Sequence, residues 1–288
     1  MFDSMGSILE ALSPEQQIAC STQNNILLTA CPGSGKTRTL THRLAYQVLR
    51  DPASKKIKIA ITYTNRAAEE ITNRLEGMNI DQSSIWAGTI HQFCMHFIIR
   101  PYAMYSKRLC KGYRIIDDYS KKAYGREIAE RLGMHLNYYD DPFQYENVRT
   151  EYKRVLKEKK EIDFDAILLI SEELLASCAF IGSNIASVIS SILVDEFQDT
   201  NELQYSILST IYKANKSIIL MFVGDVNQAI YSSLGGVAKG KKELETLYEI
   251  NFDSLSLKGC YRSTQRLVDL YSRFEISKTD AHSVAKYK

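Results

Sequence analysis

The chain has 288 residues, of which 45% are hydrophobic and 24% charged, so the composition excludes a fibrous or disordered protein and allows one large or two modest globular domains. Thirty-six basic and thirty-four acidic residues give a formal net charge of +2, which does not by itself indicate nucleic-acid binding. The six cysteines form no C-x-x-C pair, and no signal peptide or membrane-length apolar run occurs. We therefore expect a cytoplasmic protein with reduced thiols and no membrane partner.

Short apolar, β-branched runs recur along the chain, and most are followed by a helical pattern. These runs lie at residues 26–29, 57–62, 85–87, 192–194, 218–223 and 255–257. Strands that alternate with helices predict an α/β fold, with a mostly parallel sheet covered by helices on both faces. Ligands of such sheets bind outside the carboxyl ends of the strands, so the residues after each run are the candidate site positions.

The segment between residues 100 and 161 differs in character, because it holds nine of the eighteen tyrosines and an excess of basic residues. Helical patterns are expected at 121–131 and 147–161, which together predict a small helical insertion. Two interpretations stay open for its basic, aromatic surface: a track for a nucleic-acid strand, or a solvated helical face whose tyrosines pack onto the core. Upstream of it, Cys94 and His96 with His91 fit no zinc-site spacing and favour a buried helix face.

The stretch "TACPGSGKTRTL", residues 29–40, has the strand, loop and helix context of a phosphate-binding loop. Pro32, Gly33 and Gly35 let the backbone curl so that N–H groups face phosphate oxygens, and the following helix adds the positive end of its dipole. Lys36 would reach the β- and γ-phosphates, and Thr37 would bind Mg²⁺. Because Ala30 replaces the first glycine of the usual pattern, the stretch by itself also allows an ordinary glycine-rich turn.

The stretch "ILVDEFQDTN" supplies an acidic strand end about 160 residues after the phosphate loop. Three apolar residues run directly into Asp195 and Glu196. This arrangement places one carboxylate beside Mg²⁺ and a second where an attacking water must be oriented.

Eight segments, taken in chain order, resemble the ordered motifs of the UvrD/Rep-type superfamily 1 DNA helicases. They span residues 12–268 and read "LSPEQQIA", "TACPGSGKTRTL", "ITYTNRAAEEITNRL", "AGTIHQFC", "IDFDAILL", "ILVDEFQDTNELQ", "FVGDVNQAIYSSLGG" and "LKGCYRSTQRLV". The resemblance implies a RecA-like P-loop domain that uses ATP and Mg²⁺ as cofactors.

The resemblance also implies roles around the nucleotide. Gln16 would read the adenine edge, Arg38 would lie near the nucleotide, and Tyr261 would stack on adenine. Glu196 would be the general base. The implied catalytic set is Glu196, Asp195, Lys36, Gln228 and Arg262, with Thr37 and Asp195 as magnesium ligands, Gln228 as the γ-phosphate sensor and Arg262 as its neutralising cation. The implied loop contacts to the nucleotide are Ala30, Cys31, Pro32, Gly33, Ser34, Gly35, Lys36, Thr37 and Arg38.

The remaining motifs resemble the track for single-stranded DNA. The implied contacts are Tyr63, Thr64, Asn65, Thr89, His91 and Tyr231. Stacking of a base on an aromatic ring contributes about 1–3 kcal/mol and tolerates any base, so the implied binding is independent of sequence. For Tyr63 and Tyr231, packing under the sheet is the alternative.

Three positions depart from the family pattern. Ser233 and Leu234 stand where an aromatic residue and an arginine are usual, so one stacking surface and one positive charge are missing from the track. Cys260 replaces the usual asparagine before Tyr261. The chain also ends at Lys288, where the family continues into a second motor domain, so we expect either a fragment or a naturally short protein.

We predict that residues 1–100 and 162–274 form the first RecA-like motor domain, that 101–161 form the helical insertion, and that 275–288 are a linker or tail toward a second motor domain absent from this chain. The predicted function is the ATP-binding half of a single-strand-DNA-stimulated ATPase or helicase, with weak hydrolysis by this chain. One alternative is an ATP- and DNA-binding accessory subunit of a nuclease or of a repair or antiviral defence complex. Another is a P-loop kinase or small-molecule ligase.

Overall fold

The computed structural model describes residues 5–228, 239–275 and 280–285. The chain forms two compact units, one of residues Met1–Ile90 with Gly182–Lys288 and the other of residues His91–Ile181. The second unit is wider than the predicted helical insertion, because the apolar helix α9 (Phe164–Ser177) packs on the π-helical segment η1 (Cys94–Ile99) within it. The assignment of motor and insertion roles to these units stays a prediction.

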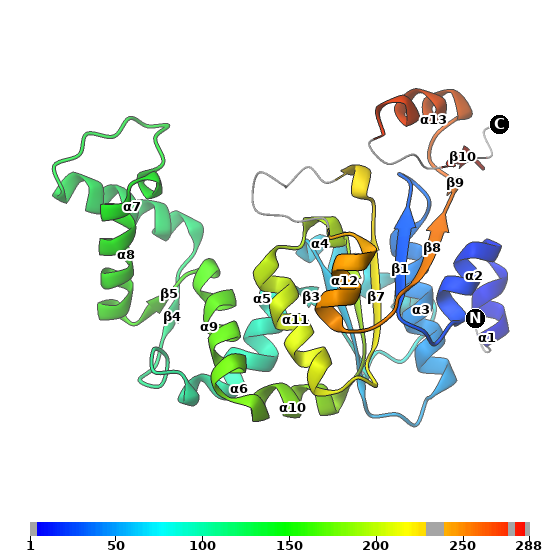
Figure 1. Ribbon diagram of the computed structural model, residues 1–288, viewed down its shortest axis with the longest axis horizontal. Coiled ribbons are helices and arrows are strands. Elements are labelled where there is room, and N and C mark those ends of the chain that lie inside the picture. Colours follow the sequence, from blue (N-terminus) through cyan, green and yellow to red (C-terminus); the bar gives the residue numbers. More distant parts are fainter. Residues whose placement is uncertain (1–4, 229–238, 276–279, 286–288) are drawn as a thin grey trace. The chain divides into compact units, whose positions relative to one another are not determined.

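The first unit is built on a six-stranded, fully parallel sheet with the order β3-β2-β6-β7-β1-β8 (Figure 1). Its strands are β1 (Ile26–Ala30), β2 (Ile57–Thr62), β3 (Ile85–Thr89), β6 (Ile189–Asp195), β7 (Ile219–Gly224) and β8 (Asp253–Leu257). Every predicted apolar run forms one of these strands. The predicted α/β class with a parallel sheet is therefore confirmed.

Helices cover both faces of this sheet. On one face lie α1 (Met5–Glu10), α2 (Pro14–Ser21), α3 (Lys36–Arg50) and α4 (Asn65–Gly77), and on the other lie α11 (Glu202–Ala214) and α12 (Lys241–Tyr248). The unit also contains α13 (Gln265–Tyr271), which packs against residues 272–274 and 282–283, and part of α10 (Ala179–Val188), which crosses the unit boundary. Strand β7 shows the two faces by its alternation: Met221 and Val223 join the core formed with α3 and α4, whereas Phe222 contacts Tyr205 of α11 and Tyr248 of α12.

The second unit is largely helical. Besides α9 and η1 it contains α5 (Ile90–Phe93), α6 (Arg100–Tyr102), β4 (Arg114–Ile115), α7 (Asp118–Arg131), α8 (Glu146–Lys159) and β5 (Glu161–Ile162). Both predicted helices are present with shifted ends. Helix α7 starts earlier because the Asp117 carboxylate caps it, and α8 ends earlier because Lys160 adopts a left-handed conformation.

Cys94 is buried in η1, as predicted, but His96 is exposed. Within the described residues no three metal-ligating side chains gather into a possible metal site. In the same ranges, no helix combines the length and apolar character needed to cross a membrane.

The segment 275–288 is predicted to be a linker or tail. Its described part contains a short strand, β10 (His282–Ser283), which pairs in parallel with β9 (Gly259–Cys260). The Val284 N–H also donates to the Cys260 carbonyl at 2.9 Å. A strand of two residues is too short to leave a periodic pattern in the sequence.

Candidate nucleotide-binding site

The phosphate loop follows β1 and leads into α3 at the carboxyl end of the sheet. Gly33 and Gly35 have φ values of 75° and 86°, the left-handed region that side chains rarely adopt. The loop is tied to the segment after β8, since the Tyr261 N–H donates to the Gly33 carbonyl at 2.9 Å. A Cβ atom at Gly33 would lie 2.6 Å from Cβ of Arg262. Glycine at this position is therefore required both by the turn and by the close packing.

Lys36 and Glu196 meet across the carboxyl ends of β1 and β6. The Lys36 Nζ lies 2.7 Å from the Glu196 Oε2, and the Gln198 Nε2 donates to the same oxygen at 2.7 Å. The Gln198 Oε1 in turn accepts from the Asp225 backbone N–H at 3.1 Å, at the end of β7. One hydrogen-bonded chain thus links the phosphate-loop lysine, the predicted general base and the neighbouring strand.

Asp195 is the last residue of β6 and is only 5% exposed. Burial, with a further contribution from the neighbouring Glu196 carboxylate, raises the pKa of Asp195 to about 7. The Thr37 hydroxyl has no hydrogen-bond partner among the described residues. A buried, electrostatically destabilised carboxylate and a spare hydroxyl fit the oxygen ligands that Mg²⁺ prefers.

Gln228, which lies four residues after the end of β7, extends the same network. Its Nε2 donates to Oδ2 of Asp225 at 2.7 Å, and Asp225 is the residue whose backbone N–H reaches Gln198. Burial raises the pKa of Asp225 above its ordinary value. Gln228 is thereby linked to Glu196 through two intervening residues, Asp225 and Gln198.

Gln16 is 2% exposed and uses both ends of its amide within the protein. Its Nε2 donates to the Ser34 carbonyl at 3.0 Å, and its Oε1 accepts from the Ser13 N–H at 3.1 Å in a capping box that starts α2. The predicted adenine contact thus requires Gln16 to exchange or share a partner. Arg38 likewise donates to the Ala11 carbonyl at 2.8 Å. By contrast, the Tyr261 side chain is 48% exposed, as a stacking surface requires.

Cys260, which replaces the asparagine usual in the family, has a packing role. Cys260 is fully buried with Cys31 and Val268, and its Sγ would lie 3.3 Å from a Cβ at Gly33. A small apolar thiol therefore supports the phosphate loop from beneath.

The predicted strand contacts divide between the two units. Tyr63, Thr64 and Asn65 follow β2, and Thr89 ends the neighbouring β3 in register with Thr62. The Tyr63 ring is 47% exposed, which does not fit the alternative of packing under the sheet. His91 belongs to the second unit, where its ring makes an edge contact with Phe164.

The predicted strand contact Tyr231 lies outside the described residues. The same holds for Ser233 and Leu234, which differ from the family pattern.

Three further residues lie in or beside the hydrogen-bonded network of Glu196 without a role predicted from the sequence: Gln198, Gly224 and Asp225. A Cβ atom at Gly224 would collide with the Gln198 amide and lie 2.6 Å from the Phe197 ring. The only signal in the sequence was their place at strand ends within two recognised motifs.

Fold and site together define a P-loop nucleotide-binding domain. Residues 15–234 match the AAA_19 family, described as AAA domain, and the chain belongs to this family. Because members of the family bind nucleotide, the match agrees with the geometry at the carboxyl end of the sheet.

The curated relatives are helicases, which confirms the resemblance to the UvrD/Rep type. The chain is 28% identical to the ATP-dependent DNA helicase PcrA of Leuconostoc citreum, over 86% of this chain and 37% of that protein. It is 26% identical to DNA helicase II of Escherichia coli strain K12, over 91% of this chain and 40% of that protein. The chain therefore spans about two fifths of the length of these relatives. Among solved structures, the Pif1 helicase of Candida albicans matches 91% of this chain and 44% of its own, at 12% identity and a TM-score of 0.46.

Proposed function

We propose that this chain is the ATP-binding half of a DNA-stimulated ATPase of the UvrD/Rep type. The observation that carries the proposal is the contact between Lys36 and Glu196 at 2.7 Å, which brings the predicted phosphate-binding cation and the predicted general base to one point. Asp195 lies beside them at the end of the same strand.

The residues of this chain divide the work of hydrolysis. The loop N–H groups and Lys36 would bind the phosphates, while Thr37 and Asp195 would hold Mg²⁺. When bound, Mg²⁺ neutralises charge that develops on the transferred phosphoryl group. Glu196 orients a water and accepts its proton. Lys36 pairs with a Glu196 oxygen, so phosphates that attract Lys36 would leave that oxygen available for the water.

Single-stranded DNA is the proposed second ligand. Tyr63, Thr64, Asn65 and Thr89 lie at the carboxyl ends of adjacent strands, and Gln228 connects to Glu196 through Asp225 and Gln198. This network gives Gln228 a route to the predicted general base, and the coupling of Gln228 to the strand contacts is a proposal that rests on the resemblance. The resemblance is the only basis for proposing a second motor domain or a nuclease, repair or defence partner.

The test is ATP hydrolysis by the purified chain, with and without oligo-dT. We expect hydrolysis that oligo-dT accelerates. Glu196→Gln should abolish the hydrolysis and retain ATP binding, which excludes a contaminating enzyme. Hydrolysis that is equal with and without oligo-dT would contradict the DNA part of the proposal.

A further inference from the structure

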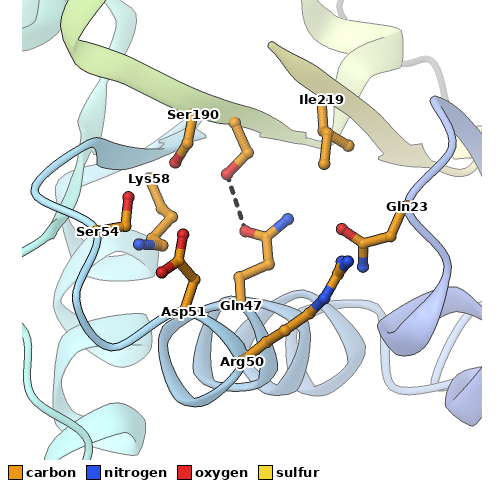
Figure 2. A pocket seen from close by; sticks show the side chains of 9 residues that line it. Gln23, Gln47, Arg50, Asp51, Ser54, Lys58, Ser190 and Ile219 are labelled. Carbon is orange, nitrogen blue, oxygen red and sulfur yellow. Dashed lines mark hydrogen bonds between the residues drawn. The ribbon is translucent and has the colours of Figure 1, made fainter. Parts of the chain in front are cut away.

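A polar pocket of about 380 Å³ lies at the amino end of the parallel sheet, opposite the phosphate loop (Figure 2). Its lining comes from the C-terminal end of α3, the loop before β2, the first residues of β2, β6 and β7, and Gln23 in the segment before β1. Helix α3 has 15 residues, so the phosphate loop and this pocket are separated by roughly 22 Å along that helix. The pocket is therefore distinct from the candidate nucleotide site.

Lys58 is the buried cation of this pocket. Its side chain enters the pocket from β2, and the residue is only 3% exposed. Its Nζ makes only long hydrogen bonds, to the Lys56 carbonyl at 3.4 Å and the Ser84 hydroxyl at 3.5 Å. Among the described residues no carboxylate lies within 4.0 Å of it. Asp51 in the same pocket attracts this ammonium group but forms no ion pair with it, so the charge of the buried lysine is only partly compensated, and an anion from solution would add to that compensation.

Two further donors in the pocket are unused. The Gln47 Oε1 accepts from the Ser191 hydroxyl at 2.8 Å, which leaves the Nε2 amide as the donor facing the pocket (Figure 2). Arg50, the last residue of α3, makes no hydrogen bond or ion pair with the rest of the described chain. The hydroxyls of Ser54 and Ser190 complete the polar lining.

One carboxylate, that of Asp51, lies in the same pocket and opposes the two cations. The formal charge of the lining is therefore +1, and Asp51 offers an acceptor for hydroxyl groups.

We propose that this pocket binds the phosphate group of a small solute. Three donors from two elements, Gln47 and Arg50 of α3 and Lys58 of β2, match the several oxygens of a phosphate better than the two of a carboxylate. The phosphate comes either from free phosphate or from a small phosphate ester whose hydroxyl groups donate to Asp51. The volume is within the range of small-molecule sites.

The test is a titration of the ¹⁵N-labelled 288-residue chain, followed by backbone amide shifts. Inorganic phosphate and ribose 5-phosphate are the probes, with ribose as the uncharged comparison. The Lys36→Ala background removes phosphate binding at the loop, so amides at residues 33–37 should stay still while those of Asp51, Ser190, Ser191 and Ile219 move and saturate. Tighter binding of ribose 5-phosphate than of phosphate assigns the ester as the source, and equal affinity assigns free phosphate.

Lys58→Met and Arg50→Ala should each weaken phosphate binding by about tenfold or more, and Asp51→Asn should strengthen it. Arg50 is exposed, so its variant tests the site even where Lys58→Met impairs folding. The proposal is overturned by an absence of saturable shifts at the pocket, by equal binding of ribose, or by shifts that respond to oligo-dT but not to either phosphate probe. Affinity unchanged in Arg50→Ala and Lys58→Met would also overturn it.

Discussion

The two ends of the parallel sheet hold their cations in opposite electrostatic conditions. At the carboxyl end, Lys36 is paired with Glu196 at 2.7 Å, and Gln198 supports the same carboxylate. At the amino end, Lys58 is buried with hydrogen bonds of 3.4 and 3.5 Å. Burial lowers the pKa of Lys58, which reports the cost of that charge.

The difference shows two ways in which one fold presents positive charge to a phosphate. The charge of the paired lysine is compensated by a carboxylate of the protein, and a ligand must compete with that carboxylate. The poorly paired lysine lowers stability, and its ligand gains from relieving that condition. Mutations at the carboxyl end should therefore disturb a hydrogen-bonded network, whereas mutations at the amino end should remove donors that this network does not use.

The largest expected effect comes from Gly33→Ala at the carboxyl end. The positive φ and the contact with Arg262 should lower the free energy of unfolding by about 1–3 kcal/mol and distort the phosphate loop. Urea denaturation and ATP titration measure the two effects. Gly77→Ala is the matched control, because nothing lies within 4 Å of its added Cβ, and it should stay within about 0.5 kcal/mol of the wild type. Equal stability of the two variants would show that the loop tolerates a side chain.

Gln198→Ala should reduce the rate of ATP hydrolysis by about ten- to a hundredfold while leaving ATP affinity nearly unchanged. The reason is that Gln198 positions Glu196 and joins it to Asp225 without itself reaching the phosphates. Single-turnover kinetics separate the two quantities. Gln82→Ala, which removes a surface hydrogen bond to the Thr72 carbonyl, serves as the control. A loss confined to ATP affinity would contradict the positioning role.

Gln16→Ala should decrease the preference for ATP over GTP by several-fold, roughly 1 kcal/mol, the net contribution of one hydrogen bond. Competition binding of the two nucleotides measures this ratio. Gln17→Ala is the neighbouring control, since the Gln17 amide donates to the Leu12 carbonyl away from the loop. An unchanged ratio together with lower stability would assign Gln16 to holding Ser34 rather than to reading adenine.

Much of the fold could be predicted because its strands are continuous apolar runs buried on both faces, as β1 and β7 are. The short strand β10 could not, since two residues carry no period. The sequence did not predict that the second unit spans residues 91–181, because the packing of α9 on η1 is a contact between segments far apart in sequence.

The site divides in the same way. Lys36, Thr37, Asp195 and Glu196 belong to motifs whose residues are contiguous, so their association with phosphate could be read from the sequence. The link from Gln198 to Asp225 joins two strand ends and depends on the order of strands in the sheet. Lys58 lies within an apolar run, and only the fold brings it to the pocket that Gln47 and Arg50 also line.

The most direct test of the central claim is the affinity of Lys36→Ala for MgATP. Lys213→Ala is the control, because it also removes a lysine that pairs with a glutamate, Glu249 at 3.2 Å, on the surface of the same unit and away from the phosphate loop. With a fluorescent ATP analogue, we expect the affinity of Lys36→Ala to fall by about a hundredfold or more, with its melting temperature retained and with Lys213→Ala unchanged. Equal ATP affinity in the wild type and in Lys36→Ala would contradict the assignment of the carboxyl end of the sheet as the nucleotide site.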